Sequence, residues 1–239
     1  MTKDVEFHFE SSPTNRPLIV KPLREFFWRR VWHKITNFRV NILGISVHFH
    51  WSMLLPLLNL IHGDVAETFI WWGILFASIL AHEFGHAFAS IRFGYPCKEI
   101  VLFVFGGVAK STGLTAMPPN KRFLTYAAGP AVSMAIFIVA ASLYRSGLNL
   151  GILETTAIVN LGLLIFNLLP MYPLDGGGMM LSWMLSKNPT FTTYRRVAVI
   201  SIVTAVVATI LIPQAIILTV LIVLLNIGMY KRGHEVSIG

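Results

Sequence analysis

The sequence predicts an all-α polytopic membrane protein with about six transmembrane helices. Of its 239 residues, 55% are hydrophobic and only 13% are charged, and the mean hydropathy is +0.67. A soluble domain of this composition would have too few polar side chains to cover its surface. Long apolar runs recur along the chain, and most of the basic residues fall between them. These observations together favour a compact helical bundle within a bilayer.

Six apolar segments are candidates for membrane spans, each of which needs about 20 residues to cross the hydrocarbon core. They cover residues 42–60, 68–93, 123–144, a fourth segment starting near residue 155, and residues 197–212 and 214–229. The fourth segment is interrupted at residues 170–178 by two prolines and three glycines, which predicts a broken helix. The last two segments have 16 residues each. We therefore expect them either to be barely long enough to cross the bilayer or to form a re-entrant pair.

The basic residues predict the orientation, because cytosolic loops carry an excess of Lys and Arg. With these spans, 18 of the 19 basic residues fall on one side and only Arg145 falls on the other. Both termini are therefore predicted to be cytosolic, in a multi-pass protein that we expect in a prokaryotic cell membrane. The chain divides into a basic arm (1–40), a membrane domain (41–232) and a tail (233–239). Residues 23–38 mix Arg and Lys with Phe and Trp, which is typical of an interfacial helix on anionic lipid or of a leader that only sets topology.

Composition also excludes several classes of protein. The net charge of +8 follows the predicted cytosolic loops, which argues against nucleic acid as a partner. The single cysteine, Cys97, excludes an internal disulfide and a cysteine-rich zinc site. The first forty residues lack the apolar core and cleavage site of a signal peptide.

Charged and titratable side chains inside a bilayer are costly, so each is a candidate for function. Within the predicted spans these are Glu83, Asp175, His48, His50, His82 and His86. The sequence His82-Glu83-Phe84-Gly85-His86 is an HExxH motif. In a helix, its two histidines lie on one face and can bind one metal ion, while Glu83 flanks that ion as a general base.

A catalytic zinc site usually has three protein ligands and one open position. Asp175 and Glu99 are the candidates for the third ligand. Asp175 is favoured because it precedes Lys187 by twelve residues, so it lies at a depth similar to that of the histidines, which are roughly 9–15 Å inside the cytosolic edge. The alternative is that residues 170–178 are a kink without a ligand. His48 and His50 are more simply explained as packed or hydrated residues than as ligands.

The sequence resembles the site-2 proteases, a family of intramembrane zinc metalloproteases, and within it the compact six-span branch similar to the Bacillus sporulation protease that activates a pro-sigma factor. The resemblance covers residues 40–230 and rests on HEFGH at 82–86, FGG at 105–107, AGP at 128–130 and NLLPMYPLDGG at 167–177. It implies that one Zn²⁺ is held by His82, His86 and Asp175, with Glu83 as the catalytic residue. It also implies a β-like loop at residues 100–113 beside the site. Contacts to substrate are expected from Asn167, Phe105, Gly106 and Gly107.

The expected function is hydrolysis of peptide bonds within or near transmembrane segments of membrane-protein substrates, that is, regulated intramembrane proteolysis. Anti-sigma factors, pro-sigma factors and signal-peptide remnants are candidate substrates. The β-prone stretch at residues 100–105 either adds a strand to an unwound substrate or forms a simple packed hairpin. One rival function is a catalytically inactive membrane zinc-binding or transport protein. A di-iron oxygenase is disfavoured because the chain has only eight histidines and no adjacent pair.

Overall fold

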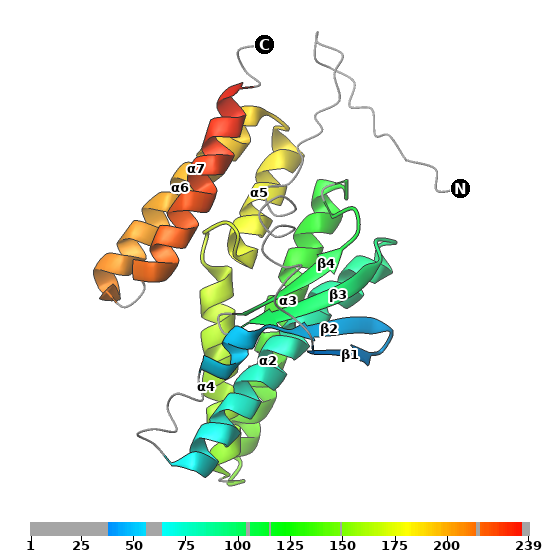
Figure 1. Cartoon of the computed structure of the whole chain (residues 1–239), viewed down its shortest axis with the longest axis vertical. Helices are drawn as coiled ribbons and strands as arrows, with labels where there is room; N and C mark the ends of the chain where they lie inside the picture. Colours follow the sequence, from blue (N-terminus) through cyan, green and yellow to red (C-terminus); the bar gives the residue numbers. More distant parts are fainter. Residues whose placement is uncertain are drawn as a thin grey trace.

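The protein is described by a computed structural model, which covers residues 38–55, 64–103, 106–114, 116–148, 150–213 and 216–235. Within these ranges it is mostly helical, with one small sheet (Figure 1). Most of the predicted interfacial helix, and also Phe105, lie outside the described residues. The helices are α2 (Val65–Arg92), α3 (Pro119–Arg145), α4 (Gly151–Leu168), α5 (Asp175–Lys187), α6 (Phe191–Leu211) and α7 (Ile216–Glu235).

The helices are those of an integral membrane protein. Among the described residues, α2, α3, α4 and residues Thr192–Leu211 of α6 are long and apolar enough to cross a bilayer, and α7 contributes a shorter apolar stretch, Ile216–Tyr230. Both α6 and α7 extend beyond the predicted 16-residue segments, to 21 and 20 residues. Hydropathy underestimated their length because it stops at polar residues, such as Arg195 and Arg196, that still belong to the helix.

The first predicted span is wrong over residues 42–55. Ile42 ends β1 (Phe38–Ile42), a tight turn at residues 43–44 leads into β2 (Ile45–Phe49), and residues 51–55 form a short 3₁₀ turn. Residues 56–60 lie outside the described part of the chain. Leu43 and Gly44 both have positive φ, at 53° and 80°, as a two-residue hairpin turn requires. Alternating β-branched and aromatic residues favour strands here, and high hydropathy alone concealed that period. His48 and His50 therefore do not lie in a membrane helix.

The hairpin extends the predicted β-like loop into a four-stranded sheet of order β1-β2-β3-β4. The loop itself forms β3 (Cys97–Phe103) and β4 (Gly106–Ser111), which pair antiparallel. β2 and β3 are parallel, and α2 makes the connection between them. The protein is thus not purely helical: β3 is an interior strand, and β4 is an edge strand.

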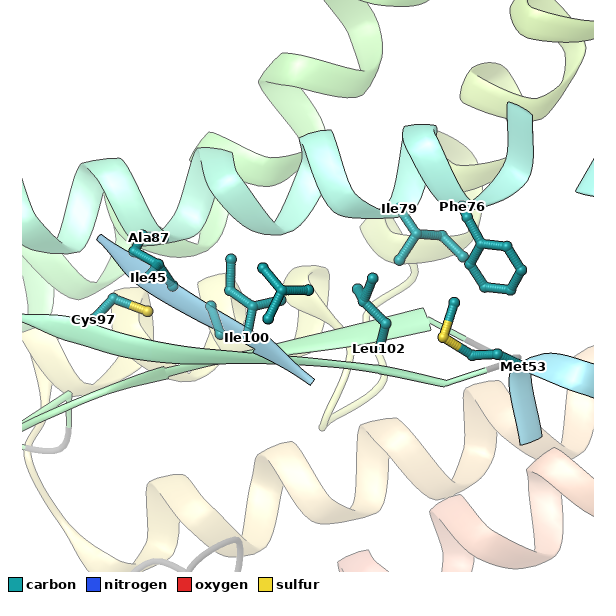
Figure 2. Packing of buried hydrophobic residues seen from close by; sticks show 10 residues of the cluster. Ile45, Met53, Phe76, Ile79, Ala87, Cys97, Ile100 and Leu102 are labelled. Atoms are coloured by element: carbon teal, nitrogen blue, oxygen red, sulfur yellow. The ribbon is translucent and has the colours of Figure 1, made fainter. Parts of the chain in front are cut away.

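One face of the sheet packs against α2, and Figure 2 shows the side chains that fill the contact. Strand residues alternate in direction, which places Ile45 and Val47 of β2, and Ile100 and Leu102 of β3, in one cluster with the helix. A bulge at Cys97/Glu99 interrupts the alternation at the start of β3. The buried cluster contains Ile45, Val47, Met53, Phe76, Ile79, Ala87, Cys97, Ile100, Leu102 and Ala109. This packing fixes the rotation of α2 about its axis, and with it the directions of the HExxH side chains.

The predicted break in the fourth helix is present. α4 ends at Leu168 and α5 begins at Asp175, with a non-helical segment of residues 169–174 between them, which we call the break segment. α5 packs on α3, while α6 and α7 form an antiparallel hairpin beside α5 (Figure 1). Met171 of the break segment is buried against Ala205 of α6 and Ile222 of α7. Met171 thus anchors the segment in the protein interior, while Pro170 and Pro173 on either side are exposed.

Candidate metal centre

Three side chains from two distant parts of the chain converge at one buried point. The Nε2 atoms of His82 and His86 lie 3.0 and 3.2 Å from Oδ2 of Asp175, and 3.2 Å from each other. All three residues are buried. Four tetrahedral ligands at zinc–nitrogen and zinc–oxygen distances would be roughly 3.3 Å apart, so this spacing suits a single ion. Among the described residues, this is the one group of His, Cys, Asp or Glu placed to hold a metal.

Helix α3 sets the orientation of both imidazole rings. Nδ1 of His86 donates to the carbonyl oxygen of Thr125 at 2.7 Å, and Nδ1 of His82 lies 2.9 Å from Oγ of Ser133. A carbonyl oxygen only accepts hydrogen bonds, so the proton of a neutral His86 is on Nδ1 and its Nε2 carries a lone pair. Such a partner on the remote nitrogen is the usual support of a histidine that binds metal.

The residues fit a divalent cation. Two histidine nitrogens and a carboxylate oxygen lie within 3.2 Å of one another, and such a group is repulsive unless a proton or a cation supplies positive charge between its members. Gly129 of α3 keeps that space open: a Cβ at this position would lie 2.2 Å from Nε2 of His86 and 2.7 Å from Nε2 of His82. Nitrogen and carboxylate ligands in this number are the set that zinc uses in catalytic sites.

Glu83 lies next to His82 in α2 and is buried. Its Oε2 accepts a hydrogen bond of 2.8 Å from the backbone amide of Ala109 in β4. Gly107 of the same strand allows this approach, since a Cβ there would lie only 2.4 Å from Cγ of Glu83. The carboxylate is therefore held between the ligand helix and the free edge of the sheet.

Asp175 is the first residue of α5, directly after the break segment. The two glycines that follow let the helix start fold back on the preceding backbone. A Cβ at Gly176 would lie 2.3 Å from the carbonyl oxygen of Leu168, and one at Gly177 would lie 2.2 Å from the amide nitrogen of Tyr172. The glycine run after Asp175 thus serves close backbone packing that brings this carboxylate to the histidines.

The other predicted residues lie elsewhere. Glu99 is exposed in β3, where its Oε2 pairs with Nζ of Lys110 at 3.0 Å. His48 lies within β2, and Nδ1 of His50 lies 2.8 Å from Oγ of Ser52. Asn167 is half-buried in the last turn of α4 and donates to the carbonyl oxygen of Leu163 at 2.9 Å. Gly106 is the first residue of β4.

Sequence reasoning assigned no role to the residues of α3 that face the site. Thr125, Gly129 and Ser133 are spaced by four, so they form one stripe of the helix. Gly129 of the AGP motif at 128–130 is the middle residue of that stripe. The sequence could have indicated the other two, because Thr125 and Ser133 are small polar residues four positions before and after it.

Comparison with known proteins finds zinc metalloproteases among the relatives of this chain. Residues 71–150 match the model of peptidase family M50. A putative zinc metalloprotease of Synechocystis is 33% identical over an alignment of 174 residues, and the match covers 64% of this chain and 46% of that protein. Stage IV sporulation protein FB of Bacillus subtilis is 32% identical over 57% of this chain and 46% of its own length. A solved structure, the site-2 protease from Methanocaldococcus jannaschii, covers 83% of this chain and 94% of the solved chain, with 26% identity and a TM-score of 0.58.

Part of the chain thus matches peptidase family M50, and most of the chain is similar in fold to a solved site-2 protease. The resemblance seen in the sequence is thereby confirmed. The chain spans less than half the length of the two curated relatives described above.

Proposed function

We propose that this site-2 protease homologue is an intramembrane zinc metalloendopeptidase that hydrolyses peptide bonds within or near transmembrane segments of membrane proteins. The observation that carries the proposal is the convergence of His82, His86 and Asp175 within 3.2 Å, inside a bundle of helices long enough to span a bilayer. Peptide hydrolysis beneath the lipid surface requires such a site, because water and its activator must be brought there by protein.

Zinc would be held by Nε2 of His82, Nε2 of His86 and the carboxylate of Asp175. When bound, it supplies a Lewis acid for the scissile carbonyl and lowers the pKa of a coordinated water. Ser133 and the Thr125 carbonyl keep the two imidazole rings aimed at the ion. Gly129 leaves room for it.

Glu83 is the proposed general base. Its carboxylate takes the proton of the attacking water and later delivers that proton to the leaving amine. The hydrogen bond from the amide of Ala109 fixes one of its oxygens, which restricts the directions from which it can act. A base held by backbone in this way loses little conformational entropy on substrate binding.

The substrate has to unwind, because a helix conceals its carbonyl groups in internal hydrogen bonds. Residues 100–103 belong to β3, which is paired on both sides and has no edge for a further strand. The edge strand β4 is the better candidate, since β3 is its one strand partner in the described part of the chain and its other side faces Glu83. Gly106 would leave room there for substrate backbone, since nothing lies within 4 Å of an added Cβ, whereas Gly107 packs against Glu83 and would contribute only its own backbone. Asn167 would hold substrate backbone or the developing oxyanion.

The proposed orientation keeps both termini cytosolic, as the positions of Lys and Arg favour. The ligands then lie nearer the cytosolic end of α2, since Arg92 ends that helix six residues after His86. Single-span proteins such as anti-sigma factors, pro-sigma factors or signal-peptide remnants are the proposed substrate classes, in a prokaryotic cell membrane.

The decisive experiment compares wild type with Glu83→Gln on a single-span substrate in liposomes, with zinc content measured in parallel. Glutamine keeps an oxygen for the amide of Ala109 but cannot take a proton at neutral pH. We expect zinc to be retained and cleavage to be abolished. An inactive zinc-binding or transport protein would give no cleavage with wild type either. Normal cleavage by Glu83→Gln would remove the proposed base.

A further inference from the structure

Two polar side chains on the α6–α7 hairpin hold the backbone just before Asp175. Oγ of Ser201 in α6 accepts a hydrogen bond of 2.8 Å from the amide of Tyr172. Nδ2 of Asn226 in α7 donates one of 2.6 Å to the carbonyl oxygen of the same residue. Ser201 and Asn226 are both fully buried, at 0% exposure. We call the two contacts the Tyr172 clamp.

The clamp answers a need created by the broken helix. Between α4 and α5 the chain leaves helical geometry at membrane depth, where an unpaired backbone group is costly. Pro170 and Pro173 have no amide hydrogen to pair. The amides of Met171 and Leu174 bond within the segment, to the carbonyl oxygens of Leu169 and Met171. Tyr172 is the residue whose amide and carbonyl are both satisfied by side chains from outside.

Burying the side-chain amide of Asn226 at this position costs free energy. In the described part of the chain its Oδ1 has no hydrogen-bond partner, although it is buried. Its Nδ2 bonds only to backbone carbonyls, those of Tyr172 and of Ile222 one turn earlier. The amide is thus used for its donor side, and that donor is directed at the break segment.

The clamp acts three residues before a proposed ligand. Met171, on the other side of the clamped residue, packs against Ala205 and Ile222 of the same hairpin. The hairpin therefore fixes the break segment by both hydrogen bonds and apolar contact, while Asp175 begins the next helix. A rotation of the peptide at Tyr172 would be transmitted to the carboxylate, since only Pro173 and Leu174 lie between them.

We propose that Asn226 and Ser201 are positioning residues for the metal centre: they hold the backbone of Tyr172 so that Asp175 reaches the two histidines. The inference rests on the proposed function only in taking Asp175 as a metal ligand. It assigns to the C-terminal hairpin a part in metal binding, although neither residue touches the ion.

The test uses the full chain in nanodiscs with Asn226→Leu, Ser201→Ala and, as matched control, Thr219→Val. Thr219 contributes to α6–α7 packing through Thr209 and the carbonyl oxygen of Ala205. In the described part of the chain, the backbone of Tyr172 bonds to Ser201 and Asn226 and not to Thr219. Two readouts are independent of catalysis: the visible absorption spectrum of the cobalt-substituted protein, and zinc affinity in competition with a chelator.

We expect both clamp variants to shift the cobalt bands and to weaken zinc binding about tenfold, while Thr219→Val matches wild type. If Asn226→Leu does not fold, Ser201→Ala alone decides, because it removes one acceptor and little volume. Wild-type spectra and affinity in the folded clamp variants would overturn the inference, and so would an equal loss in Thr219→Val. A wild-type protein that binds no metal would overturn the proposed function as well.

Discussion

The backbone amide of Ala109 donates a 2.8 Å hydrogen bond to Oε2 of Glu83. This contact joins the edge strand of the sheet to the residue that follows the first histidine of the HExxH motif. The position of the proposed base is thus set by β4 as well as by its own helix. A change in the strand that moves Glu83 should alter chemistry without altering metal binding.

The first prediction concerns Gly107, where a Cβ would lie 2.4 Å from Cγ and 2.8 Å from Cδ of Glu83. Gly107→Ala forces the Glu83 side chain to move, so its carboxylate is no longer placed to take the proton of the attacking water. We expect kcat on a single-span substrate to fall about 10²-fold while zinc content stays at the wild-type level. The measurement is a reconstituted cleavage assay together with metal analysis of the same preparation.

A matched control is Gly162→Ala, since Gly162 is a glycine of α4 with no atom within 4 Å of an added Cβ. This variant should cleave like wild type. Wild-type kcat in Gly107→Ala would show that the strand does not fix the base. A parallel loss of zinc would show that the effect of the strand extends to the metal ligands.

The second prediction concerns Gly129, which faces the imidazoles directly. An added methyl group would lie 2.2 Å from Nε2 of His86, at the side of the ring that the ion needs. Gly129→Ala should therefore reduce zinc affinity more than tenfold, by steric exclusion and by displacement of α3 from α2. Zinc competition measures this, and Gly162→Ala again serves as the control. Stoichiometric, tight zinc in Gly129→Ala would contradict the proposed location of the metal.

Local sequence patterns were enough to predict most of the helices and the helix break. The apolar runs identified α2, α3 and α4, and the two prolines and three glycines of residues 170–178 identified the helix break. The depth argument that paired Asp175 with the histidines used only helix rise and the basic residues, and the structure brings these side chains together.

The sheet was harder to predict because it depends on pairing between distant segments. Residues 42–49 are as apolar as a membrane span, and only the turn at Leu43 and Gly44 and the alternating period distinguish them as a hairpin. Their parallel pairing with β3 becomes visible only once α2 has brought the two strands together. In the same way, Ser201 and Asn226 are ordinary small polar residues in sequence, and their contact with Tyr172 is purely tertiary.

The third prediction concerns Ser133, whose Oγ lies 2.9 Å from Nδ1 of His82. Ser133→Ala removes the hydrogen-bond partner that orients this ring but leaves all three proposed ligands in place. We expect zinc affinity to fall by about 10–100-fold, the usual effect of losing such a partner. Excess zinc should restore cleavage, because only binding is weakened. A loss of activity that saturating zinc does not restore would instead indicate damage to the fold or to the base.

The last prediction distinguishes the two carboxylates that the sequence offered as third ligand. Asp175 lies 3.0 and 3.2 Å from the two histidine nitrogens, whereas Glu99 is exposed and paired with Lys110. Asp175→Asn replaces an anionic ligand with a neutral one, so we expect the purified protein to lose zinc and cleavage together. Glu99→Gln removes the same charge at a surface site and should keep both, because exposed ion pairs contribute little to stability. Metal analysis of the two variants checks this, and zinc loss in Glu99→Gln with retention in Asp175→Asn would reverse the assignment.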